Sequence, residues 1–341
     1  MSLKIPWRRY FARSLDIVIY SFIFDLFILV FLNENVLERS IGWKVIDTFA
    51  VLVLMYVIEP FLLHWFKTTP GKWIFGITVQ GRDGEKLSCE EARSRTFGVI
   101  IWGMGGSIPI LSLIMQLKSY EAAKEGKTLD WEYDSELVLK DKKKWRIIAH
   151  IAAWLVLGAL LIFSVFQTAL PRHKGELTVE KFSDNYNRLA TFYGIDDLGR
   201  LNDEGEWVVQ DNGSRPYLDR SKDVPHLEYV VENGIIKSIS FETIIENGTG
   251  RAPAYADVRR VLILAYVFAK DECGILPIRD FNALIDIIHY PYEDYHKELY
   301  GVNISCDVEY TGYLPLGYEI MYAETEEDTC YSIRFKMEDM Q

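Results

Sequence analysis

Four stretches of this chain are long and apolar enough to act as membrane segments. The hydrocarbon core of a bilayer is about 30 Å thick, which takes about 20 mostly apolar residues of helix. The four stretches are residues 14–32, 45–66, 97–117 and 145–170. Trp43 and Trp65 bracket the second stretch, as expected of residues that anchor a helix at both membrane surfaces. The pattern predicts an α-helical transmembrane domain with three to four membrane segments.

The third stretch differs from the others because its middle is rich in residues that break helices. It contains Gly103-Met104-Gly105-Gly106-Ser107, followed by Pro109. Non-helical backbone at membrane depth is tolerated only where it is buried in protein or faces water. Residues 97–117 are therefore expected either to span the membrane or to form two half-helices that return to the side they entered from.

Positive charges near the membrane predict the orientation, because cytoplasmic loops carry an excess of Lys and Arg. The first 13 residues carry four such cations and residues 67–96 carry six, whereas residues 33–44 carry two. The first two helices are thus predicted to form a hairpin with both outer ends in the cytoplasm.

The side occupied by the C-terminal half depends on the third stretch. Residues 140–146 hold five cations in seven positions, which predicts that the last apolar helix begins in the cytoplasm. Residues 171–341 would then lie outside, and we favour this arrangement although Arg172 and Lys174 oppose it. If the third stretch spans, the C-terminal domain is cytoplasmic instead.

The second half has the periodicities of a soluble α+β domain. Apolar residues recur at helical spacing in residues 178–193 and 257–270, and a short helix is expected at 280–288. Asn233-Gly234 separates two strand-like runs, which is the strongest short-range signal for a hairpin. Further strands are expected at residues 207–209, 302–311, 318–322 and 331–337. We expect the helices to pack on one side of an antiparallel sheet.

Charge and cysteine content narrow the possible functions. Residues 171–341 hold 17 Lys+Arg against 32 Asp+Glu, while the first 170 hold 20 against 17. No nucleic-acid partner is expected, since phosphate binding requires a basic surface. The four cysteines form no disulfide framework, although Cys306 and Cys330 could pair if the last domain lies outside the cytoplasm. The first apolar run is too long for a signal peptide and is interpreted as an uncleaved span.

Ionisable side chains interrupt the first two apolar stretches. Such residues are expensive in hydrocarbon and mark a candidate polar site. From a rise of about 1.5 Å per residue, we expect Asp16, Glu59 and His64 at similar depths and Asp25 near the middle of the membrane. The candidate intramembrane site comprises Arg13, Asp16, Asp25, Glu59 and His64.

Two interpretations of these residues remain open. In the first, Asp16, Asp25 and Glu59 form a path for a cation or a proton. In the second, Arg9 or Arg13 pairs with Asp16 on one helix face and only fixes the helix register. We favour the second for Arg9 and Asp16, whereas a carboxylate at the depth of Asp25 is functional by default.

A series of short motifs resembles the signature of the RDD family of bacterial membrane proteins. It begins with Arg9-x-x-Ala12-x-x-x-Asp16 and continues with Thr69-Pro70-Gly71-Lys72, Gly76-x-x-Val79, Asp83-Gly84, Leu87-Ser88 and Arg95. The resemblance covers roughly residues 5–140. The family-motif residues are Arg9, Asp16, Thr69, Pro70, Gly71, Lys72, Gly76, Asp83 and Arg95. The resemblance implies a helical membrane domain with a suggested role in transport of unidentified ligands.

Other motifs have structural explanations. Thr69-Pro70-Gly71-Lys72 lacks the second glycine of a phosphate loop and is interpreted as a turn with Lys72 at the cytoplasmic surface. The stretch 289–296 holds two histidines and two carboxylates, but Pro291 breaks their spacing, so we expect a solvated loop and no metal site. No nucleophile motif is present, so no catalysis and no cofactor are predicted.

Together these features predict a multi-pass protein of a bacterial inner membrane, with its N-terminus in the cytoplasm. The expected domains are an RDD-like transmembrane domain (1–140), a last transmembrane helix (141–170) and an acidic soluble α+β domain (171–341). The favoured function is membrane-anchored binding of a ligand or partner. The alternative is a transporter that handles a cation or proton with intramembrane carboxylates. Partners are expected to be the lipid bilayer and either further copies of the chain or other membrane proteins.

Overall fold

The computed structural model describes residues 5–340 except 133, 142, 196–197, 209–223, 248–250, 282–283, 285–289, 316–319 and 324–327. The chain forms two compact units. Unit 1 comprises Met1–Leu32 and Val36–Ser164, and unit 2 comprises Asn33–Asn35 and Val165–Gln341. The two units are described separately below.

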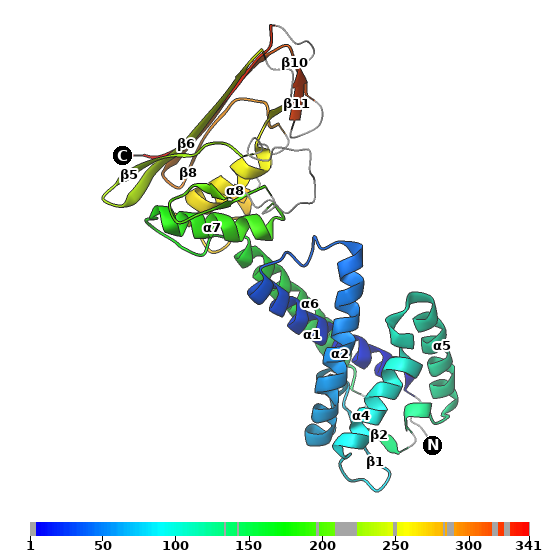
Figure 1. The fold of residues 1–341 in the computed structure, drawn as a ribbon. Helices are drawn as coiled ribbons and strands as arrows, with labels where there is room; N and C mark the ends of the chain where they lie inside the picture. The colour runs from blue at the N-terminus through cyan, green and yellow to red at the C-terminus, as the bar shows by residue number, and fades with distance from the viewer. Residues whose placement is uncertain are drawn as a thin grey trace. The chain divides into compact units, whose positions relative to one another are not determined.

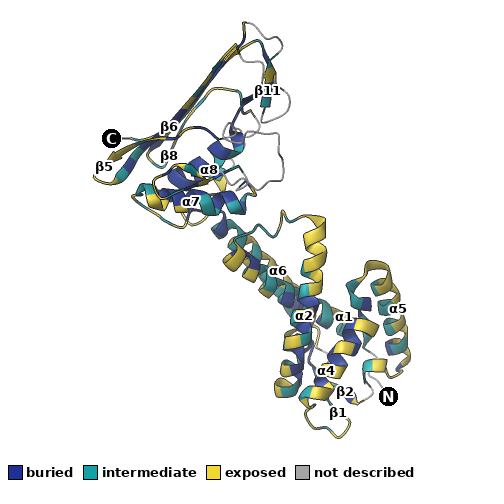
Figure 2. Ribbon diagram, viewed as in Figure 1, coloured by how far each residue is buried: buried dark blue, intermediate teal, exposed yellow. Residues whose placement is uncertain are grey.

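Three described helices are long and apolar enough to cross a membrane, which confirms the predicted transmembrane domain. They are α1 (Pro6–Phe27, continued as a π-helix to Leu32), α2 (Ile41–Phe66) and α6 (Trp145–Thr168). Many large apolar side chains on these helices are exposed in the isolated chain (Figure 2). These faces are suited to contact with lipid.

The apolar stretch 97–117 is broken and is not among the three candidate spans. Helix α4 (Cys89–Gly98) continues as a short π-helix, η2 (Val99–Gly103), and helix α5 (Pro109–Glu125) follows after a turn. Gly105 and Gly106 form this turn with φ of 59° and 61°, a conformation that glycine adopts without strain. The ring centroids of Trp7, at the start of α1, and Tyr120, near the end of α5, are 5.4 Å apart.

A small antiparallel sheet joins distant parts of unit 1. Strand β1 (Ile77–Gly81) pairs with β2 (Ser135–Leu139), with Ile77 opposite Leu139. The sheet consists of these two strands, and residues 86–87, which follow the turn after β1, are not part of it. Leu87 is instead buried in a cluster with residues of α2, β1 and α4, and Ser88 caps α4.

Unit 2 has the predicted α+β architecture (Figure 1). Helices α7 (Val179–Phe192) and α8 (Ala256–Tyr266) pack on one face of a five-stranded antiparallel sheet. Its strands, in spatial order, are β5 (Glu228–Glu232), β6 (Ile235–Glu246), β12 (Cys330–Asp339), β9 (Val302–Thr311) and β8 (Tyr295–Leu299). Asn233 and Gly234 make the turn between β5 and β6 with φ of 53° and 81°, as the hairpin signal predicted.

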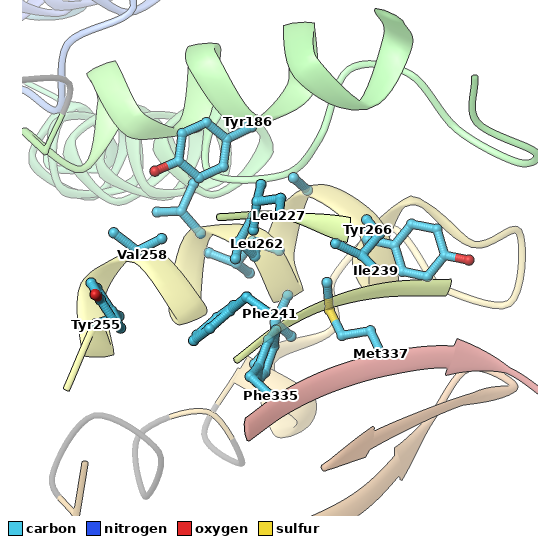
Figure 3. Packing of buried hydrophobic residues seen from close by; sticks show 14 of the residues in the cluster. Tyr186, Leu227, Ile239, Phe241, Tyr255, Val258, Leu262, Tyr266, Phe335 and Met337 are labelled. Carbon is cyan, nitrogen blue, oxygen red and sulfur yellow. The ribbon is translucent and has the colours of Figure 1, made fainter. Parts of the chain in front are cut away.

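The core of unit 2 lies between these helices and the sheet. Phe241 of β6 and Phe335 of β12 face Val258 and Leu262 of α8, and Tyr186 lies above them on α7 (Figure 3). The aromatic rings of Phe241 and Phe335 are 5.2 Å apart. Burial of this apolar surface is the main term that stabilises a water-soluble unit.

Smaller elements complete unit 2. A three-stranded sheet contains β10 (Tyr313–Pro315), β11 (Ile320–Ala323) and β7 (Arg251–Pro253), and β3 (Arg200–Leu201) pairs with β4 (Trp207–Val208). The predicted helix at 280–288, the ends of the predicted strands at 207–209 and 318–322, and His289 fall partly or wholly outside the described residues.

Cys306 and Cys330 are free in the structure. Cys306 faces Phe335 across the strand pair, whereas Cys330 faces Thr311. Five residues of β12 therefore separate the two positions, which is about 16 Å of strand. The pairing that the sequence had left open is not formed.

Candidate functional site

Charged residues from three elements of unit 1 meet in one buried cluster. Helix α1 supplies Arg13 and Asp16, and α2 supplies Glu59. Lys72 lies in the short helix α3 (Pro70–Ile74), which Thr69 caps by accepting a hydrogen bond from the backbone N–H of Lys72. Asp16, Glu59 and Lys72 are exposed by 7% or less, so all three are shielded from solvent and lipid.

Glu59 is the centre of the cluster. The guanidinium of Arg13 donates to both of its carboxylate oxygens, at 2.5 and 3.0 Å. The ammonium of Lys72 donates to the same carboxylate at 2.8 Å. A carboxylate and two cations thus tie α1, α2 and α3 together, and charge-assisted bonds of this kind are roughly twice as strong as neutral ones.

Asp16 is held mainly by α3. It accepts hydrogen bonds from the Thr69 hydroxyl at 2.5 Å and from the Gly71 backbone N–H at 2.7 Å, and its carboxylate is 3.8 Å from the Lys72 ammonium. A Cβ atom on Gly71 would lie 2.1 Å from the carbonyl oxygen of Ala12, so the close approach of α3 to α1 requires glycine.

A second group of charges adjoins the first. Glu132, in the 3-10 helix η4 (Asp130–Glu132), pairs with Arg9, and one of its oxygens is 3.9 Å from Arg95. Arg95 also donates to the Trp131 carbonyl at 3.1 Å and to the Ser135 hydroxyl at 3.3 Å. Counted over the residues that the structure describes, the two groups together contain four cations and three carboxylates, so one positive charge is in excess.

Burial lowers the pKa of the two cations that lie outside the membrane-spanning helices. It lowers the pKa of Arg95 to about 10, and the positive charge of Arg9 contributes to this shift. Burial and the nearby Arg13 also lower the pKa of Lys72. Both shifts have the sign expected where desolvation and like charge outweigh the neighbouring carboxylates.

The ion pair that the sequence suggested within α1 is not the main pairing of these charges. Arg13 pairs with Glu59 and Arg9 with Glu132, while Asp16 accepts from Thr69 and Gly71. Residues on a neighbouring element can offer two aligned oxygens to a guanidinium, which a residue three positions along the same helix does less well.

The structure separates the other two members of the predicted polar site. His64 Nδ1 is 2.7 Å from the carbonyl oxygen of Leu87. Asp25 is half-buried and interacts electrostatically with Asp47 and Arg39, at the far end of the α1–α2 pair. The candidate site of five residues is thus represented in the cluster by Arg13, Asp16 and Glu59.

The remaining motif residues have local roles. Asp83 accepts from the backbone N–H of Glu85 at 3.1 Å and shapes a turn. Gly76 lies beside the Arg146 guanidinium, which donates to the carbonyl oxygens of Trp73 and Ile74 at 3.1 and 2.6 Å. These bonds attach the start of α6 to the end of α3.

Two members of the site were not predicted from the sequence to lie in a buried polar cluster. Lys72 was interpreted as a surface anchor, but its ammonium is buried in the cluster. Glu132 was not singled out, because it lies in a polar segment that already contains several acidic residues. Glu132 also lies 123 positions along the chain from Arg9, and no rule of sequence spacing predicts a pair at that distance.

A cavity of about 640 Å³ lies beside the cluster, between α1, η2 and α5. All four cations of the cluster, Arg9, Arg13, Lys72 and Arg95, line it. Among its described lining residues there is no aspartate or glutamate. Much of the rest of the wall is apolar or aromatic, including Val99, Met104, Leu113, Leu117, Leu129 and Trp131. Cavities of this size and composition are typical of small-molecule sites.

Residues 4–130 match the model of the RDD family, and the rest of the chain has no family assignment. The N-terminal segment is thus similar to the RDD family, in agreement with the motifs found in its sequence. With the three apolar helices, this match makes the chain a membrane protein. No match to this chain was found among curated proteins or solved structures.

Proposed function

We propose that this protein is a membrane-anchored binding protein and that its RDD-family segment holds a ligand in the cavity between α1, η2 and α5. The observation that carries the proposal is the cavity itself, whose volume is about 640 Å³. Its four cations come from α1, α3 and α4 and are held by ion pairs with Glu59 and Glu132, so the site is organised before a ligand arrives. Such preorganisation lowers the entropic cost of binding.

The alternative, a path for a cation or proton through Asp16, Asp25 and Glu59, has less support. Asp16 and Glu59 are each bound to groups that hold them in place, and Asp25 is separate from both. Four cations line the cavity, and they would repel a cation that entered it. Binding of a ligand, rather than passage of a cation or proton, is therefore our preferred function.

We also propose an orientation. Contacts between α6 and α3 place the start of α6 at the same end of unit 1 as the start of α1 and the end of α2. Helix α6 has 24 residues and is long enough to cross a bilayer. With the basic N-terminal end in the cytoplasm of a bacterial cell, residues after 168 emerge on the extracytoplasmic side, as the loop charges also favour.

Filling the cavity tests the binding function. Leu117→Trp places a larger side chain in the cavity wall, and Ile110→Trp places the same side chain on an exposed position of α5 that does not line the cavity. In native mass spectrometry of the full-length protein released from membranes, we expect the mass of a bound ligand on the wild type and on Ile110→Trp but not on Leu117→Trp. Equal bound mass on all three proteins would contradict the proposal.

Two native cysteines test the orientation. Cys330 is exposed in unit 2, and Cys89 begins α4 in unit 1. The test uses two variants, in each of which only one of the four cysteines, Cys330 or Cys89, remains. A membrane-impermeant maleimide should label Cys330 in intact cells and Cys89 only after lysis. The reverse result, or labelling of neither before lysis, would overturn the proposed orientation.

A further inference from the structure

Resting on the proposed function, we infer that the ligand is an anionic membrane lipid whose phosphate head binds among Arg9, Arg13, Lys72 and Arg95 and whose hydrocarbon chain lies along α5. The inference depends on which groups face the cavity, on the charge balance of the cluster, and on the chemistry of the opposite wall.

The cavity presents the positive side of the cluster. Each of the four cations lines it, while their carboxylate partners Asp16, Glu59 and Glu132 do not. The carboxylates thus hold the cations from behind and leave the cavity wall positive. Arg and Lys side chains arranged in this way bind phosphate oxygens through charge-assisted hydrogen bonds.

The net charge of the cluster also indicates that the ligand is an anion. Four cations and three carboxylates leave an excess of one positive charge in a largely buried place. A buried charge without full compensation is costly, and an anion in the cavity would remove this cost. A cationic or neutral head would not.

The opposite wall indicates the source of the ligand. Leu113 and Leu117 of α5 line the cavity, and both are also more than half exposed. Ile110, next along α5, is 77% exposed. An apolar surface of this kind beside a membrane segment offers an acyl chain a route from the bilayer, whereas a small hydrophilic phosphate would leave it uncovered.

The test uses the full-length protein in phosphatidylcholine vesicles, because Trp7 and Trp131 line the cavity. Lipids with brominated chains quench nearby tryptophans, so brominated phosphatidic acid is titrated against brominated phosphatidylcholine. We expect saturable extra quenching by phosphatidic acid at low mole fraction and no displacement by millimolar inorganic phosphate. Displacement by inorganic phosphate would identify a soluble anion and overturn the lipid assignment.

Two variants separate charge from structure because they break the same ion pair. Arg9→Gln removes the excess positive charge, and Glu132→Gln increases it to two. The mole fraction of phosphatidic acid at half-maximal quenching should rise about tenfold in Arg9→Gln and fall about tenfold in Glu132→Gln, the effect of one charge-assisted contact. Equal weakening in both would mean that the pair serves only the fold, and would overturn the inference.

Failure of the inference can be told from failure of the proposed function. If phosphatidylcholine quenches as strongly as phosphatidic acid, and Leu117→Trp still removes bound lipid mass, the cavity binds lipid without selecting its charge. The proposed function then stands and the inference is wrong. If neither lipid gives saturable quenching and no bound mass is found, both are wrong.

Discussion

The charge cluster of unit 1 and the core of unit 2 are both well buried, but different forces hold them. In the core, Phe241, Tyr266 and Phe335 pack with aliphatic side chains between two helices and a sheet. Among the described residues of unit 2, Arg259 is the only charged side chain that is buried. In unit 1, by contrast, ion pairs and one glycine join α1, α2 and α3 at the charge cluster, and apolar residues such as Tyr20 and Met55 pack α1 against α2 beside it.

The difference follows from the two solvents. In water, removing apolar surface from solvent drives folding. In a bilayer, lipid tails are as apolar as leucine, so helices gain little by hiding apolar side chains from them. Hydrogen bonds, ion pairs and close backbone approach then supply much of the specificity, and the cluster around Glu59 combines all three.

The largest effect should come from removing the central charge of the cluster. Glu59→Gln leaves Arg13 and Lys72 buried without their carboxylate, so unit 1 should lose about 3–5 kcal/mol of stability. The matched control is Glu242→Gln in unit 2, where Glu242 pairs with Arg334 and both side chains are about half exposed. That change should cost less than about 1 kcal/mol. Thermal unfolding of both purified variants measures the difference between the two losses of stability. Equal decreases in melting temperature would contradict the prediction.

The next effect concerns close approach rather than charge. Gly71→Ala brings a methyl group to 2.1 Å from the Ala12 carbonyl oxygen, and backbone on both sides limits relaxation. We expect a loss of about 3 kcal/mol, the upper range for overpacking. Gly158→Ala, on α6 with nothing within 4 Å of the added atom, is the control and should be neutral or slightly stabilising. Yield and melting temperature in detergent should fall for the first variant only.

The same comparison explains how far the sequence predicted the structure. Helical and strand periods are local, so the three spans, α7, α8 and the turn at Asn233-Gly234 followed from the pattern of residues. The partner of an ion pair is not local: 46 positions separate Arg13 from Glu59, and 123 separate Arg9 from Glu132. The pairing of β1 with β2 was missed for the same reason.

Depth along the membrane was a partial guide to the site. It placed Asp16, Glu59 and His64 at one level, and the first two do meet through Lys72. Five residues of helix turn the chain by about 140° beyond a full turn, so His64 points away from the face of α2 that carries Glu59. To predict which residues meet, an estimate of depth must be combined with this rotation around the helix axis. It also requires the position of α3, which could not be predicted from the sequence.

The last prediction compares the alkylation of two cysteines of unit 2 and needs no substitution, so the stability of the unit is unchanged. Cys306 is fully buried, and burial raises the pKa of its thiol, so little reactive thiolate should exist at pH 8. Cys330 is exposed on β12 of the same sheet. With native protein and iodoacetamide, Cys330 should be alkylated and Cys306 should react only after denaturation, as mass spectrometry of peptides will show. Equal rates in the native state would mean that the core around Cys306 opens readily. The contrast between a core closed by apolar packing and a cluster held by ion pairs would then no longer hold.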